Sequence, residues 1–567
     1  MIVLGLSLGF NSSAALYSSD DGLLAAISQE RLNGKKNTKE LPLEAAVKCC
    51  EIAGVKIIDR IAISHYEDIT DQYFRRYSER YNLPLLNSWY NNIVSYLIMH
   101  DITVMSNSII RIPHHIAHGY STFAFYGEPN KGDYIITSDG FGDGYSGTIF
   151  QYGIGGKSIV KLKNSIALVY QFVTGALGYK EHQHEGKITG LAAFGQPKYL
   201  SEFDALYEKS KNGNFIEFRS DDYVLSRDEE NAVETSAIID FADFLKLKKA
   251  VYGLVHDLLE IGAEPKDMAA TIQEWAEQKT ISWIKAYVKD EGKNCYLAGG
   301  LFANVKINQR IKDMRLFKNV CVCPAMGDEG TSVGAALLPC HKNIPKIKSP
   351  NQCGTIADKT EVNHSFDVHS SYKRGYSIKR IDDDTLLAKW IAAQLSKNRI
   401  VCLVKGKMEF GPRALCHRSI LYNCDTKETN TWLNDKLGRT EFMPFAPVTR
   451  EEVADDLFKN LDGGRDSAKH MTMTFDCTEE FVRDYPAACH VDNTARPQII
   501  SKDEDPFIWS VLDEYQQLTG KKALINTSFN LHNNPIIEST EVAVSSWLKS
   551  DTDILVIENT IIEKVTV

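Results

Sequence analysis

The chain opens with Met1-Ile-Val-Leu-Gly-Leu-Ser-Leu-Gly-Phe10, an apolar run that ends in a glycine loop. The pattern predicts a buried strand from Ile2 to Ser7. Two more apolar stretches follow, from Ala14 to Tyr17 and from Leu23 to Ser28, and Asp21-Gly22 is a typical hairpin turn between them. The first residues therefore predict a three-stranded meander with a small polar loop at one end.

The same order of features returns after Asp133. A strand is expected over 134–137, followed by a polar loop over 138–144, a strand over 147–152, a glycine turn at 155–156 and a strand over 158–162. The recurrence favours a duplicated fold in which the two polar loops face each other across a cleft, where backbone N–H groups can bind phosphate. The alternative is that hairpins are simply common.

A change in composition after Ala336 predicts a domain boundary. Pro339, Pro345 and Pro350 are separated by lysines and an asparagine, which is typical of a linker. A new unit is predicted from Tyr376, with a helix over 384–397 and strands over 400–404 and 523–526. We therefore expect an α/β protein with a first domain over 1–345, a linker over 346–375 and a second domain over 376–567.

The composition is that of a globular protein. The 567 residues include 64 Lys+Arg and 74 Asp+Glu, a formal net charge of −10, and 43% are hydrophobic. These values exclude a disordered chain, a collagen and a coiled coil. The net acidity argues against wholesale coating of nucleic acid, although Arg31, Lys35, Lys36 and Lys39 form a local basic stretch.

No apolar run reaches the roughly 20 residues of a membrane helix. The first ten residues lack a basic leader and a small-residue cleavage site. The twelve cysteines include no CxxC pair, so neither a structural zinc nor a disulfide framework is indicated. We expect a protein of the reduced cytoplasm with no membrane attachment.

Pro113-His-His-Ile-Ala-His118 is the strongest local signal for a metal. In a helix, His114 and His118 lie one turn apart on one face, the spacing needed to bind a single ion. Asp139 and Asp328 can complete the site, and two imidazoles with carboxylates suit Fe(II), Mn(II) or Zn(II) better than Ca(II). The alternative is a histidine-rich helix start packed against its neighbours.

Two glycine-containing stretches of the first domain can bind a nucleotide. Gly299 and Gly300 follow a predicted strand and allow close approach to the backbone, and Asn304 can hydrogen-bond a base or a ribose. Lys187 stands among glycines and can neutralise a phosphate or an oxyanion. The alternatives are a tight packing turn between strand and helix, and an ordinary exposed lysine.

The second domain has several cations beside small polar residues. They are Arg413 and Arg418 after a predicted strand, Lys436, Arg439 and Arg496, with the polar loop Asn526-Thr-Ser-Phe-Asn530. Guanidinium groups bind phosphate oxygens in pairs, so the set fits a triphosphate. For any single one of these cations, the alternative is an ordinary ion pair at the protein surface. No GxxxxGK[ST] is present, and the GxSxG around Ser7 is expected to be strand.

Many stretches, in order and nearly from end to end, resemble the O-carbamoyltransferases of the nodulation and antibiotic-tailoring type. They include the histidine motif at 114–118, Glu185-Gly-Lys-Ile-Thr-Gly-Leu-Ala-Ala-Phe-Gly195, Met408-Glu-Phe-Gly-Pro-Arg-Ala-Leu415, Thr494-Ala-Arg496 and Asn526-Thr-Ser-Phe-Asn530. The resemblance implies a duplicated actin-like (RNase H-like) first domain, similar to the tRNA threonylcarbamoyl transferase. It also implies a second domain with a twisted α/β sheet, similar to the threonylcarbamoyl-adenylate synthase.

The resemblance also implies a reaction. The second domain would convert carbamoyl phosphate and ATP, with Mg(II), into carbamoyl-adenylate, and the first would transfer the carbamoyl group to an acceptor hydroxyl beside a divalent metal. Fe(II) is the expected ion, with Mn(II) and Zn(II) as alternatives, and a homodimer is compatible with the pattern. The implied catalytic residues are Lys187, Arg413, Arg418, Lys436, Arg439, Arg496 and Ser528; the binding residues are Asn11, Gly299, Gly300, Asn304, Asn526 and Asn530; the metal ligands are His114, His118, Asp139 and Asp328.

Two departures from the family pattern stand out. The family commonly has Gly-His-Asp-Ala-Ser-Ala-Ala in the first loop, whereas this chain has Gly9-Phe-Asn-Ser-Ser-Ala-Ala15. Phe10 and Asn11 therefore replace a His-Asp pair, and neither is a general base at neutral pH. Met443 precedes Pro444 where an arginine is frequent, which removes one phosphate contact.

Two classes of acceptor remain open: the hydroxyl of a sugar or natural product, and the hydroxymethyl group of 5-hydroxymethylcytosine in DNA. Phe10 and the segment Tyr73-Phe-Arg-Arg-Tyr77 can stack on bases, although an amphipathic helix that covers the cleft is the favoured interpretation of that segment. The net charge favours the small molecule. Two further hypotheses are tRNA threonylcarbamoyl transfer, which needs threonine and bicarbonate, and a nucleotide-binding regulator without transfer activity.

Overall fold

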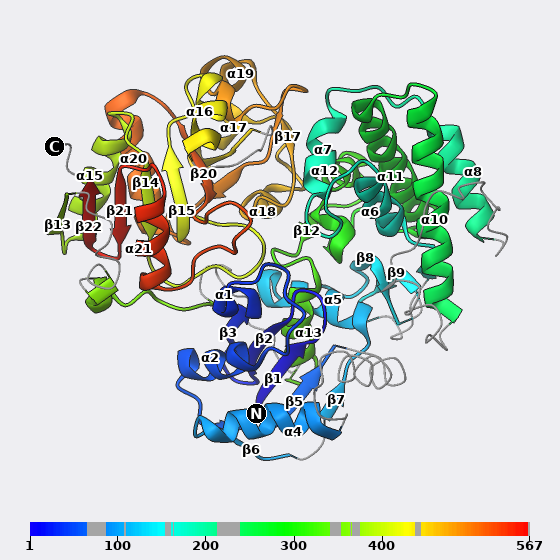
Figure 1. Ribbon diagram of the computed structural model, residues 1–567, viewed down its shortest axis with the longest axis horizontal. Coiled ribbons are helices and arrows are strands. Elements are labelled where there is room, and N and C mark those ends of the chain that lie inside the picture. Colours follow the sequence, from blue (N-terminus) through cyan, green and yellow to red (C-terminus); the bar gives the residue numbers. More distant parts are fainter. Residues whose placement is uncertain are drawn as a thin grey trace.

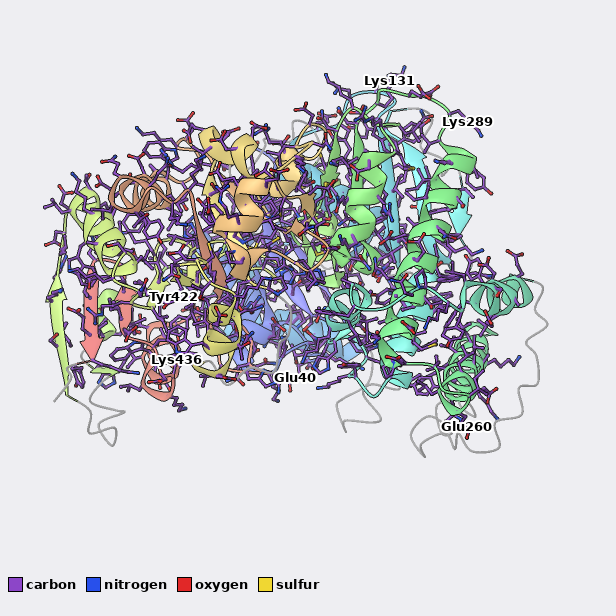
Figure 2. All side chains as sticks on the ribbon, turned by 90° about the horizontal axis from the view of Figure 1, so that it is seen from above. Glu40, Lys131, Glu260, Lys289, Tyr422 and Lys436 are labelled. Carbon is purple, nitrogen blue, oxygen red and sulfur yellow. The ribbon has the colours of Figure 1, made fainter. Side chains whose placement is uncertain are left out.

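The computed structural model describes residues 1–64, 87–106, 109–143, 145–153, 160–162, 164–211, 239–340, 353–362, 364–365, 375–436 and 444–564. In Figure 1, the N-terminal sheet (blue) lies below a helical lobe (green) and a C-terminal lobe (yellow to red). Viewed from above, Lys436 lies on the C-terminal lobe and Glu260 at the far end of the helical lobe (Figure 2). The mixed α/β class expected from the sequence is confirmed.

The first sheet has five strands in the order β3-β2-β1-β5-β7. The predicted meander is confirmed by β1 (Ile2–Ser7), β2 (Ser13–Ser18) and β3 (Gly22–Ser28), which pair antiparallel. β5 (Arg60–Ile63) and β7 (Ile109–Arg111) extend the sheet in parallel. Ser7 is buried in β1, which agrees with the expectation that it is strand rather than nucleophile.

The second sheet repeats this arrangement in the order β10-β9-β8-β11-β12. β8 (Tyr134–Gly142), β9 (Tyr145–Gln151) and β10 (Val160–Leu162) form an antiparallel meander. β11 (Cys295–Ala298) and β12 (Val320–Val322) join β8 in parallel. The polar loop predicted at 138–144 is largely the irregular end of β8, because the register between β8 and β9 shifts between Ser138 and Gly142.

Two helices hold these sheets together: α5 (His114–Tyr126) and α13 (Thr331–Leu337). A Cβ atom on Gly5 of β1 would lie 2.0 Å from the Ser332 carbonyl oxygen of α13. A Cβ atom on Gly334 of α13 would lie 1.8 Å from the Ala117 carbonyl oxygen of α5. Strand, helix and helix therefore touch backbone to backbone, which fixes the start of α13 relative to the start of α5.

The remaining elements of this half cover the two sheets. Around the first sheet lie α1 (Gln29–Asn33), α2 (Leu43–Ala53), α4 (Asn87–Met99) and the short pair β4 (Ile57–Ile58) and β6 (Thr103–Val104). Beside the second sheet lie α6 (Ile166–Ala176), α7 (Glu185–Ala192), α8 (Leu200–Lys211), α10 (Ile239–Glu260), α11 (Pro265–Tyr287) and α12 (Val305–Asp313). Short 3-10 turns span Gly300–Ala303, Asp328–Gly330 and Leu338–Cys340.

An eight-stranded mixed sheet organises the C-terminal lobe. Its strands, in spatial order, are β13 (Tyr376–Arg380), β22 (Thr560–Lys564), β21 (Ile554–Ile557), β14 (Val401–Val404), β15 (Arg418–Tyr422), β20 (Ala523–Ser528), β16 (Ala446–Arg450) and β19 (Gln498–Ile500). The strands predicted over 400–404 and 523–526 correspond to β14 and β20.

Helices cover both faces of this sheet. Val401 and Leu403 of β14 face α15 (Asp384–Leu395) and α20 (Pro506–Thr519), whereas Cys402 and Val404 belong to the core on the side of α21 (Thr540–Lys549). The helix predicted over 384–397 is confirmed as α15. The smaller elements are α16 (Glu428–Lys436), α17 (Ala454–Leu457), α18 (Arg465–Ala468), α19 (Glu479–Asp484), β17 (Phe475–Asp476), β18 (Thr494–Ala495) and 3-10 turns at Lys359–Glu361, Glu451–Val453 and Pro486–Ala488.

The two halves share apolar core. One buried cluster runs from Trp275 and Phe302 of the first half to Phe475 and Trp547 of the second. Hydrogen bonds cross the same boundary, since the Val320 N–H donates to the Gly463 carbonyl (2.7 Å) and the Asn308 amide to the Thr472 carbonyl (2.7 Å). The halves are therefore packed together rather than tethered.

Part of the linker predicted over 346–375 lies outside the described residues. Residues 353–362 are described, and they pack between the halves: the Cys353 carbonyl accepts from the Ala26 N–H of β3 (3.0 Å), and the Gly354 N–H donates to the Met408 carbonyl (2.9 Å). The predicted domain limits remain a prediction. Within the described ranges, every helix is too short or too polar to cross a bilayer.

The contact between β1 and α13 gives a stability prediction. We expect Gly5→Ala to lower the free energy of unfolding by about 3 kcal/mol or more, because backbone atoms of α13 occupy the space of the new methyl group. Gly186→Ala is the matched control, since a Cβ atom there meets no atom within 4 Å and alanine favours the helix. Urea unfolding midpoints of both variants would measure this, and equal midpoints would contradict it.

Candidate active site

The histidine motif forms the start of α5, so the helical spacing on which the metal hypothesis depends is present. Pro113 is the N-cap residue and α5 begins at His114. His114 and His118 are therefore one turn apart, and their Nε2 atoms lie 3.1 Å from each other. Both rings are buried. Two imidazole nitrogens thus meet at one point, which costs free energy unless a cation lies between them.

Two carboxylates from other elements reach the same point. Asp139 comes from β8, and its Oδ2 lies 3.2 Å from His114 Nε2 and 3.1 Å from His118 Nε2. Asp328 comes from the 3-10 turn before α13, and its Oδ1 lies 3.6 and 3.3 Å from the same two nitrogens. The structure therefore brings together all four predicted metal ligands, with donor atoms within 4.8 Å of one another.

These separations fit an ion in the middle of the four residues. Ligand bonds of about 2.0–2.2 Å place neighbouring donor atoms about 3.0 Å apart in an octahedral site and about 3.3 Å apart in a tetrahedral one. The measured values span 3.1–3.6 Å. Imidazole nitrogen with carboxylate oxygen is a donor set for Fe(II), Mn(II) or Zn(II), not for Ca(II). The residues present therefore fit a divalent transition metal.

The electrostatics of the cluster agree with this fit. Burial by itself lowers the pKa of His118, but hydrogen bonds to Asp139 and Asp328 outweigh burial and raise it to about 9. Burial raises the pKa of Asp139, yet His114 and His118 hold it well below its usual range. The carboxylates thus stabilise positive charge at the point where the four side chains meet.

Close backbone approaches shape the site. A Cβ atom on Gly142 would lie 2.2 Å from Cδ2 of His114, so only glycine leaves room for that ring. Gly299 has φ +106°, and a Cβ atom there would lie 2.2 Å from the Ser138 carbonyl oxygen. The Gly300 N–H donates to Asp139 Oδ1 at 3.3 Å. Gly299 and Gly300 therefore support Asp139.

His115 faces away from the cluster. Its Nδ1 lies 3.0 Å from the Thr137 hydroxyl and its Nε2 donates to the Tyr145 carbonyl at 3.0 Å. Burial, with the nearby His114 and His118, lowers the pKa of His115 to about 3. This ring is therefore a neutral structural residue.

Three residues of this half that the sequence predicts to bind or act on a ligand are Asn304, Lys187 and Asn11, and their surroundings differ. Asn304 caps α12, accepting from the Lys306 and Ile307 N–H groups, and its amide also pairs with Gln273. All its side-chain polar atoms are used inside the protein, so the prediction of a base or ribose contact gains no support. Lys187 is half-buried within α7 rather than on a loop. Asn11 has φ +52°, and its buried Oδ1 has no hydrogen-bond partner among the described residues.

Sequence reasoning missed His182, which packs on Phe10. The two rings stack with centroids 4.4 Å apart, and Lys39 Nζ lies 3.5 Å from the centroid of Phe10. Partial burial lowers the pKa of His182, and the nearby Lys39 acts in the same direction, while Glu181 and Asp139 oppose them. No motif contains His182; only its positive φ of 63° marks the position, and φ is not visible in a sequence.

A second cluster lies in the C-terminal lobe, where Arg413 and Arg496 are half-buried neighbours. Burial lowers the pKa of both guanidinium groups, and the charge of Arg413 lowers that of Arg496 further. No carboxylate in the described part of the chain pairs with either, and the buried Arg413 Nε lacks a hydrogen-bond partner there. Two adjacent, uncompensated arginines are an arrangement that favours an anion.

Asn526 and Gly411 position these arginines. The Asn526 amide donates to the Ala414 carbonyl (3.1 Å) and to Gln498 Oε1 (2.6 Å), so it ties together the segments that follow Arg413 and Arg496. Gly411 has φ +116° and packs on Pro324, while its carbonyl accepts from Arg31 at 2.9 Å. Pro324 is four residues before Asp328, so the arginine loop rests on the segment that carries a metal ligand.

Arg418 is a correction to the predicted phosphate-binding set. Its side chain is fully buried, and its guanidinium donates to the carbonyls of Gly406 (3.0 Å), His417 (2.8 Å) and Thr355 (2.8 Å). Because backbone oxygens and not solvent surround it, Arg418 joins three chain segments. It does not present its charge to a ligand in this structure.

The other predicted residues of this lobe lie apart from the arginine pair or outside the described ranges. Lys436 pairs with Asp551 at 2.5 Å, at the end of α16. Ser528 Oγ donates to Asn530 Oδ1 at 2.5 Å, and the Asn530 amide bonds the Leu531 and Asn534 carbonyls, which orders the loop after β20. Arg439, Met443 and the stretch from Tyr73 to Tyr77 fall outside the described residues.

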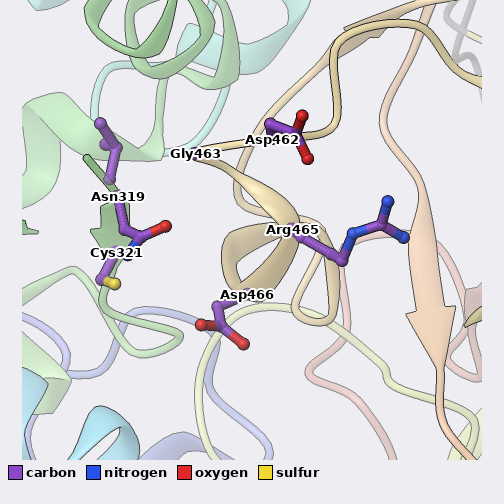
Figure 3. Close-up of a pocket in the computed structure, with 7 residues that line it drawn as sticks. Asn319, Cys321, Asp462, Gly463, Arg465 and Asp466 are labelled. Atoms are coloured by element: carbon purple, nitrogen blue, oxygen red, sulfur yellow. The ribbon is translucent and has the colours of Figure 1, made fainter. Parts of the chain in front are cut away.

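A pocket of about 270 Å³ lies where the halves meet, lined by Asn319, Cys321, Asp462, Arg465 and Asp466 among others (Figure 3). Arg465 points away from the two aspartates in Figure 3 and pairs with Asp455 at 2.7 Å. The polar side chains of this pocket do not point toward a common point, and none of the predicted site residues lines it.

The metal cluster gives a binding prediction. We expect Gly142→Ala to weaken binding of Fe(II) or Zn(II) by at least about tenfold, because the new methyl group displaces the His114 ring. His118→Ala removes a ligand and should abolish tight binding. His100→Ala is the matched control, since this histidine is exposed directly after α4 and belongs to neither group of described residues that could hold a metal ion. Equilibrium dialysis with elemental analysis measures bound metal; wild-type affinity in Gly142→Ala would count against the site.

The pair Arg413 and Arg496 gives a second binding prediction. We expect wild-type protein to bind pyrophosphate, and Arg413→Ala to lower that affinity about ten- to a hundredfold through loss of charge-assisted hydrogen bonds. Arg483→Ala is the control, because Arg483 is exposed and pairs with Asp484. Isothermal titration calorimetry at two salt concentrations reports the affinities. Unchanged binding by Arg413→Ala would show that the pair is not an anion site.

Comparison with known proteins identifies the family. The model described as Carbamoyltransferase N-terminus matches residues 2–337, and the one described as Carbamoyltransferase C-terminus matches residues 392–564. An uncharacterized protein of Methanocaldococcus jannaschii is 29% identical, with 100% of both chains covered. Nodulation protein NolNO of Sinorhizobium fredii is 28% identical over 100% of this chain and 83% of its own, and Nodulation protein U of the same species is 25% identical over 96% of each. Because the N-terminal match alone spans more than half of its length, the chain belongs to the carbamoyltransferase family and is an enzyme.

Proposed function

We propose that this carbamoyltransferase uses ATP to convert carbamoyl phosphate into carbamoyl-adenylate in the C-terminal lobe. It then transfers the carbamoyl group to an acceptor hydroxyl beside the His114, His118, Asp139 and Asp328 cluster. The observation that carries the proposal is the pair Arg413 and Arg496, which are partly buried and lack a carboxylate partner among the described residues. The N-terminal half would then be the actin-like, duplicated domain suggested by its two sheets of identical strand order.

The arginine pair suits the first step. Both substrates are phosphates. Water would release inorganic phosphate from carbamoyl phosphate, an oxygen of the resulting carbamate would attack the α-phosphorus of ATP, and pyrophosphate would leave, so negative charge is present before and after the reaction. Arg413 and Arg496 repel each other in the absence of an anion, and a polyphosphate between them removes that repulsion. Asn526 keeps the two segments at a fixed distance through its bonds to Ala414 and Gln498.

The metal cluster suits the second step. His114, His118, Asp139 and Asp328 would hold the ion, Fe(II) foremost with Mn(II) or Zn(II) as alternatives, and the ion would act as a Lewis acid on the carbamoyl or phosphoryl oxygens. Gly300 orients Asp139 through its N–H. Gly142 leaves room for His114.

The acceptor hydroxyl must lose a proton when it attacks. The new bond joins the acceptor oxygen to the carbamoyl carbon, the bond from that carbon to the adenylate phosphate oxygen breaks, and AMP leaves. Neither Phe10 nor Asn11 accepts the proton. We propose Glu185 for this role, because it accepts from the backbone N–H of His182, the residue that stacks on Phe10, at 2.6 Å, and burial raises the pKa of its carboxyl to about 7.

The environment of Phe10 favours a small hydroxylated acceptor over DNA. A base that stacked on Phe10 would have to displace Lys39 or His182, which already contact the ring. The basic stretch is also partly neutralised, since Arg31 and Lys35 pair with Glu30 and Glu40. A sugar or natural-product hydroxyl is therefore proposed, with 5-hydroxymethylcytosine in DNA as the alternative.

A donor assay tests the proposal. Purified protein is incubated with ATP, Mg(II), labelled carbamoyl phosphate and a panel of hydroxylated acceptors, including duplex and single-stranded DNA with hydroxymethylcytosine. We expect pyrophosphate release that requires carbamoyl phosphate, and a mass increase of about 43 on one acceptor, as acyl transfer to a hydroxyl gives. Arg413→Ala should lose pyrophosphate release, and Arg483→Ala should keep it.

Other outcomes have definite meanings. Pyrophosphate release that requires threonine and bicarbonate would contradict the proposal and indicate threonylcarbamoyl transfer. Nucleotide binding without release from any donor would contradict it as well, and would indicate a regulator that has lost catalysis.

A further inference from the structure

Two cysteine sulfurs of the C-terminal lobe are in contact. All twelve cysteines are described; eleven are buried and only Cys489 is partly exposed. Cys489 Sγ lies 3.9 Å from Sγ of Cys477, whose side chain is 4% exposed. The buried thiol of Cys477 therefore lies next to the thiol of Cys489, which solvent and small molecules can reach.

The backbone holds the two sulfurs in place. Cys477 directly follows β17, and its N–H donates to the Asn493 carbonyl at 2.8 Å. Cys489 directly precedes a turn in which the His490 N–H donates to the Thr494 carbonyl at 2.9 Å. Because β17 pairs with β18, both cysteines are anchored to one small sheet. A disulfide, with sulfurs about 2.05 Å apart, needs a movement of only about 2 Å.

The surroundings also divide the roles of the two thiols. The contact with Cys477 lowers the pKa of the Cys489 thiol and outweighs burial and the charge of Asp492, which raise it; Lys427 acts in the same direction as the contact. The same contact, together with burial, raises the pKa of Cys477. Cys489 is thus both the more accessible sulfur and the one that more readily becomes a thiolate, as an attacking cysteine must be.

We propose that Cys477 and Cys489 are a site of reversible oxidation, at which a low-molecular-weight disulfide converts the pair into an intramolecular disulfide that displaces the segment carrying Arg496. The effect on Arg496 rests on the proposed function of the arginine pair; the oxidation itself does not.

The exchange balances without any further reactant. The Cys489 thiolate attacks one sulfur of the small disulfide, whose S–S bond breaks, and a first thiolate leaves. The Cys477 thiol then loses its proton and attacks Cys489 Sγ, which breaks the mixed disulfide and releases the second small thiol. Two electrons pass from the cysteine pair to the small disulfide, which is reduced to two thiols.

The segment after Cys489 is bonded to the start of α12 and leads to Arg496. Asp492 pairs with Lys306 at the start of α12, and the Thr494 hydroxyl accepts from Lys306 Nζ at 3.0 Å. Arg496 directly follows β18, whose Thr494 and Ala495 pair with β17. The contacts with Lys306 hold Asp492 and Thr494 in place. A shift of Cys489 toward Cys477 would therefore distort the backbone between Cys489 and Arg496.

The test has a chemical arm and a functional arm. The full-length protein is incubated with glutathione disulfide, digested without reduction and analysed by mass spectrometry. We expect a peptide that links Cys477 to Cys489, absent in Cys489→Ser and in Cys477→Ser, and removed by dithiothreitol. No linked peptide, or linkage to other cysteines in equal amount, would overturn the oxidation site.

The functional arm measures carbamoyl-phosphate-dependent pyrophosphate release before and after oxidation. We expect a fall of at least about tenfold in the oxidised wild type, as a misplacement on the order of 1 Å at a binding group produces. Dithiothreitol should restore the rate, and Cys489→Ser should keep its rate under the same treatment. A linked protein with an unchanged rate would overturn the effect on Arg496. Absence of pyrophosphate release from reduced wild type would instead overturn the proposed function and leave the linkage result standing.

Discussion

The backbone contact between β1, α13 and α5 is the constraint on which the rest of the N-terminal half depends. Gly5 and Gly334 allow strand and helices to approach until carbonyl oxygens occupy the space of a side chain. Such contacts cannot relax by rotating a side chain, so the elements keep one relative position. The start of α5 carries His114 and His118, and the turn before α13 carries Asp328. The geometry of the cluster is thereby set by main chain rather than by flexible side chains.

In the C-terminal lobe, Arg413 and Arg496 lie close together and no carboxylate of the described residues pairs with them. Other groups resist their mutual repulsion. Asn526 bridges the two segments, Gly411 rests on Pro324, and Arg31 holds the Gly411 carbonyl. The repulsion is the physical reason that an anion would be bound there, because binding removes it. The two sites are also in contact through the backbone, because Gly411, near Arg413, packs against Pro324 in the segment that leads to Asp328.

The sequence predicted what is local and failed where tertiary contacts decide. The meander over β1 to β3 follows from alternation and a hairpin turn, and the spacing of His114 and His118 places two nitrogens on one helical face. Asp139 and Asp328 were expected as partners, and they lie beside the histidines. Arg418 could not be placed, because the carbonyls that surround it come from Thr355 and Gly406 as well as its own neighbour. Asn304 could have been recognised as a cap, since asparagine before an amphipathic helix is a standard N-cap. His182 has no sequence signal, because its position depends on a turn that packs on Phe10.

The apolar cluster that the two halves share affects how the protein unfolds and whether the halves can exist separately. Residues from both halves of the chain, Trp275 and Trp547 among them, lie in one continuous buried network. Cutting the polypeptide near its middle would expose that network on each fragment, so isolated halves would aggregate instead of working as separate partners. Heat or denaturant should melt both lobes in one transition. Substitutions that persist in either lobe must then leave this common interior intact.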